Sequence, residues 1–307
     1  MAKVLSATVI ILLLGASAFS LWNYYNELPG EAKQFFVKDN EELNVNATNK
    51  LSMFMDNMRF DTNSISYSFV DCGRDTQDRM KQAFQIVSDE TKEIIFYESQ
   101  SAKIIIYCSE KKGEKRNSTF VAGEGGPDNL INLSLYPLIG SGKIYLYGPA
   151  GKPYCDYPIV ELHELMHVFG FDHINKTNEI LYPYVKCDQR MTSDIVEELK
   201  RLYSIKPKSD LTLENLSANL RGNYLDFNIT ILNRGLISAR NISLEIAGTE
   251  KVIETIPVGE LSPGISQTIT ARNILVKTNN QNQISFKVST PSEEYFTENN
   301  QLMATSN

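Results

Sequence analysis

Histidine is almost absent from this chain. Its 307 residues include three histidines, and all three lie in the eleven-residue stretch HELMHVFGFDH, from His163 to His173. A surplus of basic residues is also lacking, because the formal net charge is −7. Without a basic stripe to neutralise phosphates, the composition argues against nucleic acid as a partner.

The chain has one long apolar run, and it lies at the N-terminus. Met1-Ala2-Lys3 precedes the apolar stretch 4–14, and Ala16 and Ala18 then form an A-x-A-like cleavage site. One interpretation is a signal peptide, and the other is an uncleaved membrane anchor, so residues 1–25 are one or the other. Either one exports the rest of the chain. We therefore expect an extracellular protein that is secreted or anchored to the outer face of the cell membrane, with membrane contact by the N-terminal segment if it is uncleaved.

Residues 26–61 are polar and weakly periodic, and we interpret them as a stalk or pre-segment. A first domain is expected over residues 62–205. Apolar residues alternate with serines over Ile65–Phe69, which predicts a strand. Asp75 is a candidate cap for a helix that runs to about Glu90. Ile104–Tyr107 is a short β-branched run typical of a buried strand. A strand, a helix and a strand in this order predict a parallel pair with a crossover.

The second half of this domain continues the mixed pattern. Residues 120–127 and 143–148 are typical of two further strands. Pro158–Phe169 is typical of a helix, which ends at Gly170. Thr192 is a candidate cap for a last helix that runs through Tyr203. The first domain is therefore predicted to be α/β (α+β).

Beyond residue 205 the helical period disappears. Leu225, Phe227, Ile229 and Ile231 alternate strictly with other residues, and similar alternation recurs further along the chain. Short alternating strands separated by turn signals predict an all-β, immunoglobulin-like sandwich of about seven strands over residues 206–307.

Cysteine is scarce but even in number. The four cysteines contain no C-x-x-C spacing, which disfavours a cysteine-ligated metal, and in an exported chain they favour disulfides. Cys72 and Cys108 end two strands that are expected to be neighbours, whereas Cys155 precedes the histidine-bearing helix and Cys187 follows it. We expect the pairs Cys72–Cys108 and Cys155–Cys187, although the sequence alone permits three pairings.

The histidine stretch predicts a metal site. His163 and His167 are four residues apart on a helix, so both rings leave the same face one turn apart. Gly170 allows a sharp turn that brings His173 back as a third nitrogen ligand, which leaves a fourth position for water, as in catalytic zinc sites. Glu164 lies beside the first histidine. The full spacing H-E-x-x-H-x-x-G-x-x-H arises by chance on the order of 10⁻⁶ times in a chain of this composition.

With this motif, the chain resembles the metzincin metallopeptidases and, among them, the matrixin-like catalytic domain. The resemblance covers about residues 62–205 and includes Ile180-Leu181-Tyr182-Pro183. It implies that His163, His167 and His173 bind Zn²⁺ and that Glu164 is the general base. The segment Phe120–Gly126 looks like the edge strand that pairs with an extended substrate in this family.

Two features differ from the family pattern. The metzincin methionine turn aligns with Leu181, which is apolar and similar in volume but offers no thioether. The matrixin cysteine switch is also missing, since residues 26–60 contain no cysteine.

Tyr182 and Tyr184 are further candidates for lining the site.

The predicted function is an exported zinc metalloendopeptidase that hydrolyses a protein or peptide substrate. The alternative is a catalytically inactive, metzincin-like binding or adhesion protein; a metallohydrolase that acts on a non-peptide bond is a further alternative. Residues 208–307 resemble CARDB-type adhesion modules through Ser209-Asp210-Leu211, the N-R-G turn at residues 233–235 and Glu298-Asn299-Asn300. That resemblance implies a cell-surface or extracellular protein partner for the sandwich.

Overall fold

The computed structural model describes residues 51–109, 115–116, 119–133, 135–148, 155–249, 251–276 and 283–305. The expected signal peptide or anchor at residues 1–25 lies outside these residues, as does the pre-segment up to residue 50. Within the described ranges, no helix has both the length and the apolar character needed to cross a membrane.

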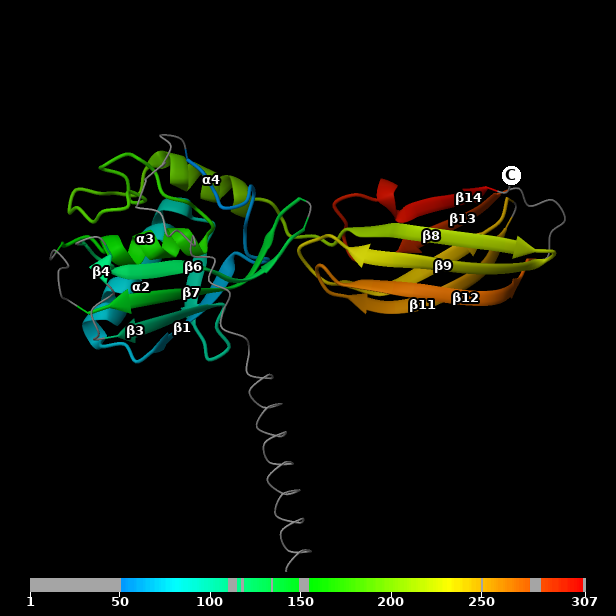
Figure 1. Cartoon of the computed structure of the whole chain (residues 1–307), viewed down its shortest axis with the longest axis horizontal. Coiled ribbons are helices and arrows are strands. Elements are labelled where there is room, and N and C mark those ends of the chain that lie inside the picture. The colour runs from blue at the N-terminus through cyan, green and yellow to red at the C-terminus, as the bar shows by residue number, and fades with distance from the viewer. Residues whose placement is uncertain are drawn as a thin grey trace, which may run out of the picture. The chain divides into compact units, whose positions relative to one another are not determined.

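The first domain is built on a five-stranded sheet (Figure 1). Its strands lie in the order β2-β1-β3-β7-β6. Their bounds are β1 Ser64–Val70, β2 Ile95–Glu98, β3 Ile104–Ser109, β6 Gly123–Ile131 and β7 Leu138–Tyr147. Strand β1 runs parallel to β2 and β3, and β3 runs parallel to β7, whereas β6 is antiparallel to β7 at the edge of the sheet.

The expected parallel pair β1 and β3 is confirmed, but the sequence pattern missed β2, which also pairs with β1. The strand expected from residue 120 is partly wrong. Strand β6 begins at Gly123 and continues to Ile131, and Thr119–Phe120 forms β5, which pairs with β4, Lys115–Arg116.

Three helices complete the domain: α2 Arg74–Thr91, α3 Ile159–Val168 and α4 Ser193–Tyr203. Helix α2 begins one residue before the predicted cap, since Gly73 is its N-cap and Asp75 lies in the first turn. An acidic side chain there is still stabilised by the helix dipole. Thr192 is the N-cap of α4 as predicted, but its hydroxyl donates to Glu179 instead of capping the helix.

One apolar core joins these helices to one face of the sheet. The face of α2 predicted from periodicity is buried in it: Met80, Ala83, Phe84 and Val87. The core also extends upstream of the boundary expected at residue 62, because Met58, Arg59 and Phe60 are buried. Arg59 donates to the carbonyls of Phe60, Leu202 and Ile205, and this fastens the segment to the end of α4.

The four cysteines form two disulfides, Cys72–Cys108 and Cys155–Cys187, which confirms both expected pairs. The first joins the ends of the parallel neighbours β1 and β3. The second joins the segment before α3 to the loop that follows Leu181.

The second domain is a sandwich of two antiparallel sheets, β11-β10-β13-β14 and β12-β9-β8 (Figure 1). The seven strands are β8 Leu211–Arg221, β9 Tyr224–Asn233, β10 Ala239–Ala247, β11 Val252–Leu261, β12 Ser266–Leu275, β13 Gln283–Ser289 and β14 Gln301–Thr305. A short 3₁₀ turn, η1 Glu298–Asn300, precedes β14. The predicted alternation is confirmed, since Leu225, Phe227, Ile229 and Ile231 all enter the apolar core between the sheets.

The N-R-G segment closes one end of this sandwich. The side chain of Asn233 is fully buried and makes four hydrogen bonds. Its Oδ1 accepts from the amides of Asp210 and Gly235, and its Nδ2 donates to the carbonyls of Ile237 and Leu261. Because every polar atom of this amide has a partner, the hydrogen bonds offset the cost of burying it, and the residue holds the turn in place.

Candidate metal centre

Helix α3 places two of the predicted ligands on one face. His163 and His167 are one turn apart, and their ring centroids are 4.5 Å apart. The rest of the helix is almost entirely buried, with Leu162, Leu165 and Met166 in the core. The helix position is therefore fixed by packing on its apolar side, and the two imidazoles are held by that packing.

Gly170 ends this helix and turns the chain back. Its φ of +89° lies in the left-handed region, which glycine adopts without steric cost. A Cβ atom here would also lie 2.8 Å from Sδ of Met58. The turn brings His173 to the other two histidines, with ring centroids 5.2 Å from His163 and 4.6 Å from His167.

The three Nε2 atoms converge on one point. The distance is 2.9 Å between His163 and His167, 3.3 Å between His163 and His173, and 3.2 Å between His167 and His173. Nδ1 of His163 lies 2.7 Å from the Ile180 carbonyl, and Nδ1 of His167 lies 2.8 Å from the Phe171 carbonyl. A carbonyl only accepts, so Nδ1 carries the proton on both rings and Nε2 presents a lone pair.

Lone pairs held this close repel one another unless a cation lies between them. Four ligands around a tetrahedral zinc with bonds of about 2.0–2.1 Å lie ~3.3 Å apart, so the observed nitrogen separations suit that ion. Burial lowers the pKa of all three histidines, and the pKa of His163 falls to about 4. Neutral imidazole is the form that binds a metal, and imidazole suits zinc, copper, iron and nickel.

Glu164 follows the first histidine on α3 and is 6% exposed. Edge strand β6 lies directly against it, because a Cβ atom added at Gly125 would lie 2.3 Å from the Glu164 carbonyl oxygen. The Gly-rich start of β6 therefore allows this end strand of the described sheet to approach the helix that carries the histidines. The edge strand thus lies against the helix that carries Glu164 and two of the three convergent imidazoles.

Leu181 occupies the turn that the sequence aligned with the metzincin methionine. Its side chain is fully buried, and its carbonyl accepts from the amide of Ile174. The preceding residue, Ile180, supplies the carbonyl that faces His163. The turn thus packs beneath the histidines with leucine in place of methionine.

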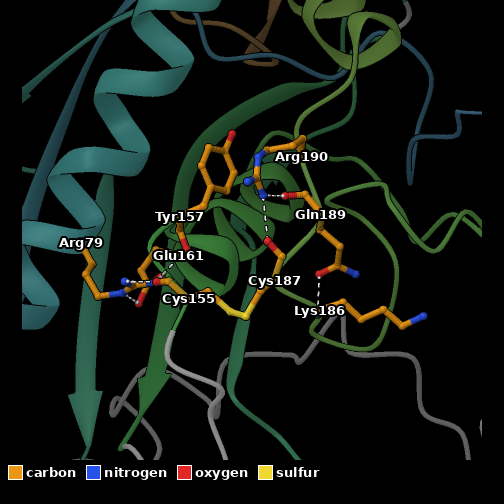
Figure 2. Close-up of a disulfide and its surroundings, with 8 residues drawn as sticks. All are labelled: Arg79, Cys155, Tyr157, Glu161, Lys186, Cys187, Gln189 and Arg190. Atoms are coloured by element: carbon orange, nitrogen blue, oxygen red, sulfur yellow. Dashed lines mark hydrogen bonds and ion pairs between the residues drawn. A yellow bond between two sulfur atoms is a disulfide. The ribbon is translucent and has the colours of Figure 1, made fainter.

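The second disulfide connects two segments that border the histidines. Figure 2 shows Arg79 of α2 beside it, and the guanidinium donates to the carbonyls of Cys155 and Tyr157 at 2.9 and 3.0 Å. Arg79 also pairs with the buried Glu161 of α3 at 3.3 Å. On the other side of the bridge, Arg190 donates to the Cys187 carbonyl at 3.0 Å. The start of α3 is therefore tied both to α2 and to the loop after Leu181.

Three residues at or near the site carried no recognisable signal in the sequence. The ring of Phe54 stacks on His167 with centroids 6.0 Å apart, yet it lies in a stretch with no clear periodicity. Arg79 and Glu179 are isolated charges without a motif. Of the tyrosines suggested to line the site, Tyr182 and Tyr184 lie with ring centroids 5.8 Å apart, and Tyr184 is 40% exposed.

A mixed sheet that ends in an antiparallel edge strand, and a helix that presents two of three convergent imidazoles, together form a candidate metal centre. The matrixin family model matches residues 59–204. This part of the chain is therefore a matrixin-like metallopeptidase domain, and an immunoglobulin-like sandwich follows it. No match was found among curated proteins.

Solved structures give weaker likenesses. The CARDB domain of a Pyrococcus furiosus protein, in complex with di-metal ions, is 18% identical, with a TM-score of 0.26; the match covers 31% of this chain and 84% of that one. High choriolytic enzyme 1, a hatching enzyme zinc-protease from the medaka fish Oryzias latipes, is 18% identical, with a TM-score of 0.24, over 38% of this chain and 49% of that one. With TM-scores this low, neither likeness supports a conclusion about function.

Proposed function

We propose that this chain is an exported zinc-dependent endopeptidase. The observation that carries the proposal is the convergence of three Nε2 atoms within 2.9–3.3 Å of one another. His163, His167 and His173 would hold the ion. When bound, zinc supplies a Lewis acid that polarises a peptide carbonyl and lowers the pKa of a water molecule.

The residues of the chain supply the remaining chemistry. The carboxylate of Glu164 accepts a proton from the attacking water and returns it to the nitrogen of the departing amine. Burial of Glu164 strengthens its electrostatic interaction with the reacting atoms, because the local dielectric is low. Proton storage on this one carboxylate thus serves both halves of the hydrolysis.

Strand β6 is the proposed binding edge for substrate. It pairs with β7 on one side and is the last strand of the sheet among the described residues, so an extended peptide would pair with its other edge. Main-chain hydrogen bonds would supply affinity with little dependence on side chains. A peptide paired with β6 would lie near the proposed base, because β6 packs against Glu164.

Export is part of the same proposal. Two disulfides in one domain are typical of an oxidising compartment, and the apolar run at residues 4–14 is typical of a signal peptide or an anchor. For the sandwich we propose a role in binding an extracellular or cell-surface protein. Its described core is apolar, which suits a module that presents a surface.

The test is zinc content measured together with hydrolysis of a peptide library. Wild-type protein should bind one zinc per chain and cleave peptides. Glu164→Ala should keep the zinc and lose about 10²–10⁴-fold in rate, since one general base contributes that much. The exposed Glu197→Ala of α4 is the matched control and should behave as wild type. Zinc binding without cleavage in the wild type would favour the alternative, an inactive metzincin-like binding protein.

A further inference from the structure

Glu179 is a buried carboxylate that the proposed hydrolysis does not use. The residue is 1% exposed. Its carboxylate accepts three hydrogen bonds: from the amide of Ile180 at 3.1 Å, from the amide of Thr192 at 3.3 Å and from the Thr192 hydroxyl. Burial of a carboxylate is costly, so these three donors are needed to keep it in place.

These contacts join two separate parts of the fold. Thr192 is the N-cap of α4, where the helix dipole favours an acidic group. Ile180 lies in the turn beneath the histidines, and its amide also donates to the Arg190 carbonyl at 2.9 Å. Glu179 therefore fastens the turn to the start of α4, and through α4 to the domain core.

The same turn contacts a proposed metal ligand. The carbonyl of Ile180 accepts from Nδ1 of His163 at 2.7 Å. That hydrogen bond decides which ring nitrogen carries the proton, and it sets the direction of the Nε2 lone pair. A displacement of Ile180 would therefore release the His163 ring from its orientation.

We propose that Glu179 is a positioning residue for His163, acting through Ile180. It keeps the main chain of the turn in place, so that the Ile180 carbonyl stays on Nδ1 and Nε2 stays aimed at the other two imidazoles. This inference rests on the proposed metal site. It differs from a purely structural role, in which Glu179 fastens the loop and has no effect on metal affinity.

The experiment measures Zn²⁺ affinity by chelator competition, together with thermal unfolding of the metal-free protein. Glu179→Ala should weaken zinc binding by up to about 100-fold, because losing the outer hydrogen bond of a metal ligand usually costs about 10–100-fold and the Ile180 carbonyl would no longer be held on Nδ1 of His163. Glu179→Gln should restore most of the affinity. A glutamine oxygen can accept from both amides, and its amide nitrogen can donate to the Thr192 hydroxyl, so the geometry survives without the charge.

Two controls separate positioning from general destabilisation. Glu197→Ala removes an exposed carboxylate of α4. Ile94→Val lowers stability by trimming a fully buried side chain next to β2. Both should leave zinc affinity unchanged. Zinc affinity in Glu179→Ala equal to that of Ile94→Val would overturn the proposal while leaving the metal site intact, whereas a wild type that binds no zinc would overturn the proposed function as well.

A milder variant covers the case in which Glu179→Ala does not fold. Thr192→Val removes the hydroxyl donor and leaves the two amide donors in place. It should weaken zinc binding by less than Glu179→Ala, and the Nδ1 proton of His163 should exchange faster with solvent in the metal-free protein. Wild-type affinity and wild-type exchange in Thr192→Val would contradict the inference.

Discussion

The two domains bury different kinds of side chain. Among the described residues, the matrixin-like domain buries five acidic, basic or imidazole side chains, Arg59, Glu161, Glu164, His167 and Glu179. The sandwich buries one, Asp210, at the start of β8. Its central cluster is made of apolar residues from both sheets.

This contrast distinguishes the domain that carries the candidate metal site from the domain whose described core is apolar. Buried charges and imidazoles cost free energy, so a fold retains them where they are hydrogen-bonded and have a role to serve. In the first domain, Glu161, Glu164 and His167 lie on α3. Glu179 bonds the amide of Ile180, whose carbonyl contacts His163. Arg59 is the exception, because it fastens its segment to the end of α4. The sandwich, by contrast, is stabilised mainly by apolar burial.

A core substitution in the sandwich should test this separation with the largest change in stability. Phe286 is fully buried and packs edge-on against Phe227. Phe286→Ala should lower the free energy of unfolding of the sandwich by about 3–5 kcal/mol. Calorimetry and peptide hydrolysis should show a lower sandwich transition with unchanged zinc affinity and unchanged cleavage below that transition. Loss of cleavage while the sandwich is still folded would contradict the separation.

The two disulfides allow a comparison within the first domain. They close loops of similar length, with sequence separations of 36 and 32 residues. Replacing either pair by serine should therefore cost a similar ~3–4 kcal/mol in free energy of unfolding. Only loss of Cys155–Cys187 should also weaken zinc binding, because that bridge joins the segment before α3 to the loop after Leu181. Equal zinc affinities in the two double variants would argue against this role of the second bridge.

Leu181→Met should have the smallest effect. The substitution restores the residue typical of metzincins at a fully buried position, and swaps of leucine for methionine usually cost less than about 1.5 kcal/mol. Zinc affinity and cleavage rate should stay within a few-fold of wild type. A large gain in cleavage rate would show that the thioether does more than fill space.

Much of the site was predictable because its signal is local. The spacing of His163, His167 and His173 is fixed by helix geometry and by one glycine turn, and both are legible without tertiary information. The alternation in the sandwich is equally local. The expected pair Cys72–Cys108 depended on taking β1 and β3 as parallel neighbours, which the structure confirms, although the sequence alone left three pairings open.

The missed features depend on contacts that no pattern encodes. Strand β2 lies at the sheet edge opposite β6, and three of its four residues are exposed, so it lacks the apolar alternation of a half-buried strand. The Met58–Phe60 segment looks irregular in sequence because a fully buried arginine interrupts it. Glu179 is one acidic residue among many, and only the fold brings Thr192 to it.

The most direct test of the account is X-ray absorption spectroscopy of the zinc-loaded protein. The account predicts one zinc per chain with three imidazole nitrogens at about 2.0–2.1 Å and a fourth, light-atom ligand. His173→Ala should reduce the imidazole count or release the metal. A spectrum with fewer than three imidazoles in the wild type, or one unchanged by His173→Ala, would contradict the central claim.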